Sequence, residues 1–254
     1  MSTPADHGHS EACCNVPPIV ASGYEIKGSY ETFGGIKTYS TGPNDASKGI
    51  LYVHDIFGYK DQTLQGADIL AVTNHHQNYK VLIPDFFNGE PAPLEIFPPD
   101  NQDKKDRLMK FLGGNPPGVT AEKLPAYVKA ASEAFPTIKA WGVVGFCWGG
   151  KVVSLITASA ENPFAAGAEC HPAMVDPKDA PGIKVPLAML ASKDEPANDV
   201  EAFEKNLTVP HHVETFSDQV HGWMAARADL KDERVKSEYV RGYKTVVEFF
   251  GKHL

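Results

Sequence analysis

The sequence predicts an α/β fold, in which a mostly parallel, doubly wound sheet is flanked by helices in a single domain. Two patterns carry this prediction. Continuous runs of β-branched and other apolar residues are typical of parallel strands buried on both faces, and stretches of helix length alternate with them. The chain has 254 residues, 42% of them hydrophobic, which is enough to bury a core of that size.

The first predicted element is a hairpin in residues 24–41, where two short alternating runs flank Gly34 and Gly35. Five later runs are predicted as buried parallel strands: residues 50–54, 80–84, 140–144, 165–168 and 185–190. A further strand is expected over residues 212–216. The predicted helices are residues 61–78, 121–134, 151–160, 199–206 and 233–253.

Two segments lie outside this alternation. Residues 1–18 are small and polar, so we expect a flexible tail ahead of a domain that spans residues 19–254. Residues 86–118 are rich in proline and contain a charged, helix-like patch. We expect this long segment to pass over the ends of the strands as a candidate lid.

Composition narrows the class of function. The net charge is −8 and lysines and arginines do not cluster, which argues against nucleic-acid binding. No apolar run reaches the roughly 18 residues of a membrane span, and the first ten residues lack the pattern of a secretory signal. Four cysteines are few for a secreted disulfide scaffold. We therefore expect a cytoplasmic protein that acts on small molecules.

The most specific motif is residues 145–150, Gly-Phe-Cys-Trp-Gly-Gly, between a predicted strand and a predicted helix. Glycines two residues before and after Cys147 leave room for a sharp strand-to-helix turn, and such a turn exposes a nucleophile. The dipole of the following helix favours a thiolate. The alternative is a buried cysteine in a glycine-rich turn.

A nucleophile of this kind needs an acid and a histidine downstream, each just after a strand. Asp194 and His221 satisfy both conditions, although Asp194 could instead cap a turn and His221 could be a surface loop residue. His171 follows another strand end, so it competes for the role of base or lines the pocket. Cys170 beside it is expected to be structural.

The oxyanion donors should be the backbone N–H groups of Trp148 and Ile56, the latter in the loop after the strand over residues 50–54. Asp55 places a carboxylate at the same rim, where it could also cap a turn. Several aromatic residues accompany the motif loops and could form either an aromatic pocket or core packing: Phe57, Phe86, Phe87, Trp148 and Trp223.

With cysteine in the turn, His-Asp-Ile-Phe-Gly at residues 54–58, Lys-Asp at 193–194 and His-Gly at 221–222, the sequence resembles the dienelactone hydrolase family of α/β-hydrolases. The resemblance runs from about residue 23 to the C-terminus and is greatest to the fungal members. It implies a triad of Cys147, Asp194 and His221, with oxyanion donors at Ile56 and Trp148.

The resemblance also implies roles for two charged residues. Asp55 stands where bacterial members carry a glutamate that holds the resting cysteine, so it is a candidate modulator of the nucleophile. Arg227 is a candidate for binding a substrate carboxylate. With Phe57, His171 and Trp223, it completes the set of candidate substrate-binding residues.

We therefore expect a cysteine-dependent hydrolase of a small ester or lactone that uses no cofactor or metal and is a monomer or homodimer. One alternative is an inactive hydrolase-fold protein that binds a small metabolite. Another is metal binding by the tail, through His7, His9, Cys13 and Cys14, although their spacing matches no closed zinc site.

Overall fold

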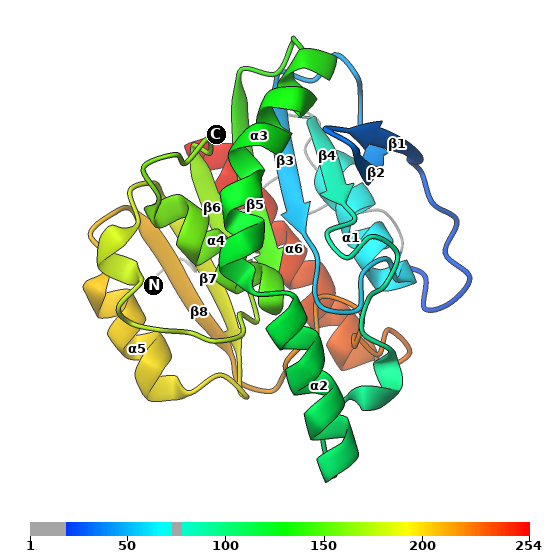
Figure 1. Cartoon of the computed structure of the whole chain (residues 1–254), viewed down its shortest axis with the longest axis vertical. Helices are drawn as coiled ribbons and strands as arrows, with labels where there is room; N and C mark the ends of the chain where they lie inside the picture. The colour runs from blue at the N-terminus through cyan, green and yellow to red at the C-terminus, as the bar shows by residue number, and fades with distance from the viewer. Residues whose placement is uncertain (1–18, 73–77) are drawn as a thin grey trace, which may run out of the picture.

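Eight strands form one sheet in the computed structural model, which describes residues 19–72 and 78–254 (Figure 1). The strands are β1 (Ser29–Phe33), β2 (Ile36–Thr41), β3 (Lys48–Val53), β4 (Tyr79–Pro84), β5 (Ala140–Phe146), β6 (Ala166–Cys170), β7 (Leu187–Ser192) and β8 (His211–Phe216). Their order across the sheet is β1-β2-β4-β3-β5-β6-β7-β8. β2 runs antiparallel to β1 and β4, and all other neighbours are parallel.

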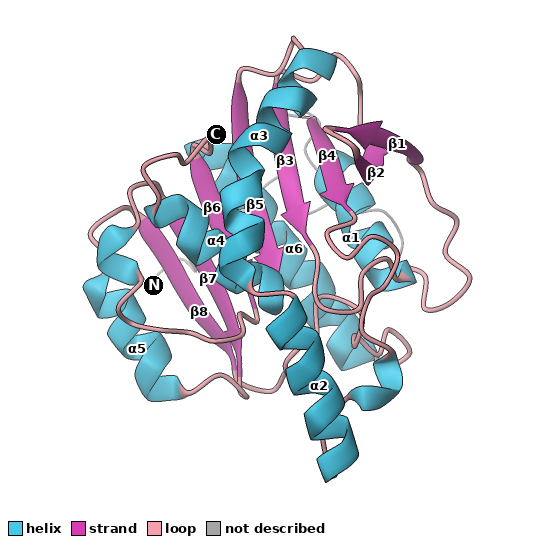
Figure 2. Ribbon diagram, viewed as in Figure 1, coloured by secondary structure: helices cyan, strands magenta, loops and turns pink. Residues whose placement is uncertain are grey.

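Six α-helices connect and cover the described strands (Figure 2). They are α1 (Asp61–Val72), α2 (Gln102–Gly114), α3 (Pro117–Ala134), α4 (Trp148–Ala158), α5 (Ala197–Asn206) and α6 (Glu233–His253). Short 3₁₀ turns occur at η2 (Leu94–Ile96) and η3 (Ala180–Gly182). None of the helices in the described ranges is long and apolar enough to cross a bilayer.

The core lies on both faces of the sheet because apolar residues occur continuously along the central strands. In β3, Leu51 and Val53 join a cluster with residues of α3 and α4. Ile50 and Tyr52 point the other way, into a cluster with residues of α1 and α6. This alternation is the period of two expected of a strand, and it confirms the predicted doubly wound sheet.

The predicted hairpin is present as β1 and β2, joined at Gly34 and Gly35 with φ values of 57° and 78°. Positive φ at both central residues is the requirement of a tight hairpin turn, and glycine meets it without a steric penalty. The predicted strands and helices are all found, with shifted ends. For example, α3 begins at Pro117, four residues before the predicted start, because proline is well suited to a first helical turn.

Residues 86–118 are less irregular than predicted. About half of the segment is η2 and α2, and α2 extends away from the sheet (Figure 1). Asn101 caps α2 by accepting a hydrogen bond from the N–H of Lys104, and none of the helix residues is fully buried. The predicted tail over residues 1–18 and the end of the first predicted helix, at 73–77, lie outside the described residues.

Candidate active site

Cys147 lies in the turn between β5 and α4, with φ 55° and ψ −115°. Its surroundings require the flanking glycines: a Cβ atom at Gly145 would lie 2.1 Å from the carbonyl oxygen of Gly149, and one at Gly149 would lie 2.2 Å from that of Val53. The Cys147 N–H donates to the carbonyl of Cys170 at 3.1 Å. The turn is therefore held in a left-handed conformation, and the Cys147 side chain stays partly exposed.

His221 follows β8 and connects the thiol to a carboxylate. Its Nδ1 lies 2.7 Å from Oε1 of Glu195. Burial alone would lower the pKa of His221. The charge of Cys147 and its hydrogen bond to the ring, together with the same two interactions from Glu195, outweigh burial and raise the pKa to about 10. The contacts with Cys147 and Glu195 therefore favour the protonated imidazole.

The prediction that Asp194 orients the His221 ring is wrong in this structure. Asp194 is exposed, and its Oδ2 accepts the backbone N–H of His221 at 2.8 Å. Glu195 is the buried carboxylate, with its side chain only 3% exposed, and its Oε2 accepts the N–H of Ser192. The backbone turn after β7 directs the second acidic residue inward, and the longer glutamate side chain reaches the ring.

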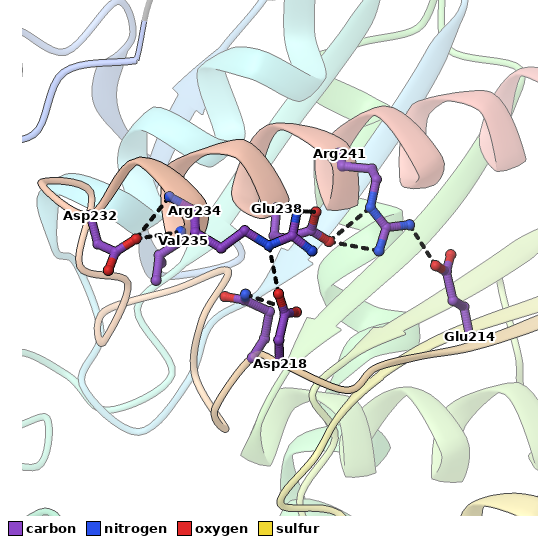
Figure 3. A network of polar contacts seen from close by, with 8 residues as sticks. Glu214, Asp218, Asp232, Arg234, Val235, Glu238 and Arg241 are labelled. Carbon is purple, nitrogen blue, oxygen red and sulfur yellow. Dashed lines mark hydrogen bonds and ion pairs between the residues drawn. The ribbon is translucent and has the colours of Figure 1, made fainter.

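A network of ion pairs fixes the loop that carries His221 (Figure 3). Asp218, three residues before His221, pairs with Arg234 at the start of α6. Glu238, one turn further along α6, pairs with both Arg234 and Arg241, and Arg241 also reaches Glu214 on β8. The loop is thus attached to both the strand before it and the helix after it.

The two expected oxyanion donors are both available. In the described part of the chain, neither the N–H of Ile56 nor that of Trp148 donates to a protein acceptor. Trp148 opens α4, where the first N–H groups of a helix lack partners within it. Its indole is buried and donates to the carbonyl of Asn115, at the end of α2, at 2.8 Å. Ile56 is also buried, and its carbonyl accepts the N–H of Ala92 at 2.8 Å.

Asp55 has contacts other than the expected one with the nucleophile. It is 1% exposed, its Oδ1 accepts the N–H of Phe57 at 2.8 Å, and its Oδ2 accepts the N–H of Ala226 at 3.1 Å. Burial raises its pKa to about 6, against the opposing effect of those two hydrogen bonds and of the charges on His221 and Lys60. Both carboxylate oxygens therefore bind backbone groups rather than the thiol.

The structure places the candidate substrate-binding residues in different surroundings. Trp223 is fully buried and packs on Phe216, with ring centroids 4.3 Å apart, so its assignment to the pocket is wrong. Phe57 is 3% exposed and belongs to the core, where its ring meets that of Phe97 edge-on. Core packing was the alternative for both, and it is found for Trp223. The ring of Phe97 that Phe57 meets also contacts Arg227, so the role of Phe57 in substrate binding stays a prediction.

His171 lies next to the ring of His221, and Arg227 contacts the backbone of His221. His171 is fully buried, with its ring 5.2 Å from that of His221, and burial lowers its pKa well below the usual value. Among the described residues, neither of its ring nitrogens has a hydrogen-bond partner. Arg227 donates to the carbonyl of His221, and its guanidinium lies 4.3 Å from the ring centroid of Phe97. Burial lowers the pKa of Arg227, against the opposing charges of three residues that include Cys147.

Cys170 is buried, and burial raises the pKa of its thiol well above the ordinary value, which fits a structural side chain. Among residues 19–72 and 78–254, no cluster of three or more His, Cys, Asp or Glu side chains could hold a metal ion. The alternative metal site at His7, His9, Cys13 and Cys14 lies outside the described residues.

Comparison with known proteins identifies the family of this chain. The model of the dienelactone hydrolase family matches residues 36–254. The chain belongs to the dienelactone hydrolase family. As a member, it is a hydrolase of small ester or lactone substrates.

Individual relatives match nearly the whole chain of this dienelactone hydrolase family member. An AIM2 family protein of Schizosaccharomyces pombe is 35% identical, over 94% of this chain and 98% of its own. The human carboxymethylenebutenolidase homolog is 27% identical, over 86% of this chain and 88% of its own. Among solved structures, a dienelactone hydrolase of Anabaena variabilis superposes with a TM-score of 0.62 at 13% identity, covering 91% and 98% of the two chains, which shows the shared fold.

Proposed function

We propose that this protein hydrolyses small esters or lactones with Cys147 as a covalent nucleophile, His221 as acid and base, and Glu195 as the residue that orients His221. One observation carries the proposal: the ring of His221 contacts both the thiol of Cys147 and the carboxylate of Glu195. A base held between a nucleophile and a third group is the arrangement expected of nucleophilic catalysis.

The geometry supports the following sequence of steps. The sulfur of Cys147, deprotonated beside the protonated His221, attacks the carbonyl carbon, and the carbonyl oxygen becomes an oxyanion. The N–H groups of Ile56 and Trp148 stabilise that charge. The ester C–O bond then breaks, and His221 gives its proton to the departing oxygen. This leaves a thioester on Cys147 and a neutral imidazole.

Hydrolysis of the thioester reverses these roles. Neutral His221 takes a proton from water, and the hydroxide adds to the acyl carbon. The C–S bond breaks, the acid is released, and the thiolate and imidazolium return. Glu195 stabilises the imidazolium at both stages by accepting the hydrogen bond from Nδ1.

The substrate is a small ester or lactone, and Arg227 is the candidate group for binding a carboxylate on it. Its guanidinium lies close enough to Cys147 and Asp194 for their charges to affect its pKa. A surface of net charge −8 offers no general attraction for an anion, so any preference for one would depend on this local group. The cytoplasmic location, and a monomer or homodimer, stay predictions.

The test compares wild type with Cys147→Ala and Cys147→Ser on p-nitrophenyl acetate, cyclic esters and dienelactone. Cys147→Ala should abolish turnover of every substrate that wild type hydrolyses. Cys170→Ala is the matched control, because it removes a thiol on the neighbouring strand that is buried away from solvent, and it should retain activity. Full activity in Cys147→Ala would overturn the proposal.

The alternative is a protein that binds a metabolite without turnover. Iodoacetamide distinguishes the two, because a thiolate paired with His221 should alkylate rapidly at neutral pH. An ester analogue should protect Cys147. A thiol that reacts no faster than a free cysteine, together with an absence of turnover, would favour the binding protein.

A further inference from the structure

Asp55 connects two loops that come from distant parts of the chain. One oxygen of its carboxylate accepts the N–H of Phe57, next to the oxyanion donor Ile56. The other accepts the N–H of Ala226, which is 171 residues away. A single buried carboxylate thus joins the oxyanion loop to the loop after β8.

The second of these loops carries the groups that act on the substrate. It begins at His221, and its chain is folded by successive turns in which the N–H of Ala225 donates to the carbonyl of Gly222 and that of Ala228 to Ala225. Arg227, the residue after Ala226, returns to the carbonyl of His221. These bonds hold Ala226 in a fixed position relative to the base and the guanidinium.

Burial makes the charged form of the Asp55 carboxylate unfavourable. Asp55 is 1% exposed, and burial raises its pKa to about 6 even though two backbone N–H groups bind it. A buried charge is unfavourable unless hydrogen bonds compensate for it. Here the compensation comes from two N–H groups that would otherwise be left unpaired in the interior.

We propose that Asp55 is a positioning residue that sets the separation between the oxyanion donor Ile56 and His221, and that it does not control the thiol. This inference rests on the proposed function. It differs from the role implied for the equivalent glutamate of bacterial relatives, because within the described residues the Asp55 carboxylate bonds two backbone N–H groups and makes no hydrogen bond to the thiol of Cys147.

The test uses Asp55→Asn and measures two quantities, the kcat for p-nitrophenyl acetate and the rate at which iodoacetamide alkylates Cys147. An amide has one acceptor oxygen, so its NH₂ group must face the N–H of either Phe57 or Ala226. The oxyanion loop should move away from the loop of Ala226, and kcat should fall by about tenfold to a hundredfold. Glu195 and the Asp218–Arg234 ion pair still hold His221 beside Cys147, so the rate of alkylation should stay within about twofold of wild type.

Asp85→Asn is the matched control. Asp85 follows β4, and its carboxylate accepts the N–H of Phe87 at 3.2 Å in the same kind of local turn; in the part of the chain that the structure describes, this carboxylate makes no hydrogen bond to a second loop. Its kcat should equal that of wild type. If Asp55→Asn fails to fold by circular dichroism, Asp55→Glu replaces it, because it keeps both acceptors on a longer stem; its kcat should fall while alkylation is unchanged.

Two results would overturn the inference. Alkylation that changes by the same factor as kcat would mean that Asp55 controls the thiol. A kcat that is unchanged in Asp55→Asn would mean that the link between the loops has no role in turnover. Both differ from failure of the proposed function, which would appear as hydrolysis that survives Cys147→Ala in the same assay.

Discussion

Replacing Glu195 with glutamine tests which carboxylate orients the base. The carboxylate of Glu195 accepts two hydrogen bonds, from Nδ1 of His221 at 2.7 Å and from the N–H of Ser192. Glutamine offers one acceptor oxygen. In one orientation its NH₂ group faces Nδ1 and forces the wrong tautomer, and in the other it faces the N–H of Ser192.

The expected loss is large because the side chain of Glu195 is only 3% exposed and water cannot replace the missing acceptor. An amide in place of the orienting carboxylate of a serine protease triad lowers kcat by about 10⁴, and we expect Glu195→Gln to lower kcat by roughly 10³ or more. Asp194→Asn keeps an oxygen for the backbone N–H of His221, so its kcat should stay within about threefold of wild type.

The assay is the steady-state hydrolysis of p-nitrophenyl acetate by wild type and the two variants, with circular dichroism to confirm folding. The comparison of the two losses of kcat shows which carboxylate orients His221. If Asp194→Asn loses as much activity as expected for Glu195→Gln, while Glu195→Gln behaves like wild type, Asp194 is the triad acid and the assignment made here is wrong.

Two further predictions concern groups around the site. Burial raises the pKa of Glu169 to about 8 from 4.5, so the folded protein holds a proton that the unfolded chain releases between those values, and stability should fall as the pH rises through this window by up to about 1.4 kcal/mol per pH unit. Glu169→Gln has no carboxyl group to ionise at this position, so its Tm relative to that of wild type should rise from pH 5 to pH 8. A Tm difference between the two proteins that does not change with pH would contradict the raised pKa of Glu169. Trp148→Phe removes the indole donor to the carbonyl of Asn115, which should cost about 1–3 kcal/mol of stability, seen as a lower Tm. It keeps the backbone N–H, so a loss of kcat as large as that of Cys147→Ala would contradict the backbone assignment of the oxyanion donor.

The sequence predicts those parts of the molecule that depend on local pattern. The glycines around Cys147 identify the turn because each is needed within a few residues of the strand-to-helix junction. The hairpin at Gly34 and Gly35 is found for the same reason. The strands follow from apolar runs whose side chains alternate between two buried faces.

Three features depend on long-range geometry, and the sequence pattern does not determine them. Asp194 and Glu195 are adjacent carboxylates after one strand, and only the direction of the turn decides which one meets His221. Trp223 lies two residues after that histidine yet points into the core. Asp55 binds Ala226, and no local pattern predicts a partner so distant in the chain.

The most direct test of the central claim is to trap the covalent intermediate. Wild-type protein is mixed with p-nitrophenyl acetate, quenched in acid within the first turnover, and examined by intact-mass and peptide mass spectrometry. A thioester should add the mass of one acetyl group to the peptide that contains Cys147, together with a burst of p-nitrophenol that matches the enzyme concentration. Turnover without any adduct, or an adduct that persists in Cys147→Ala, would contradict the assignment of Cys147 as the nucleophile.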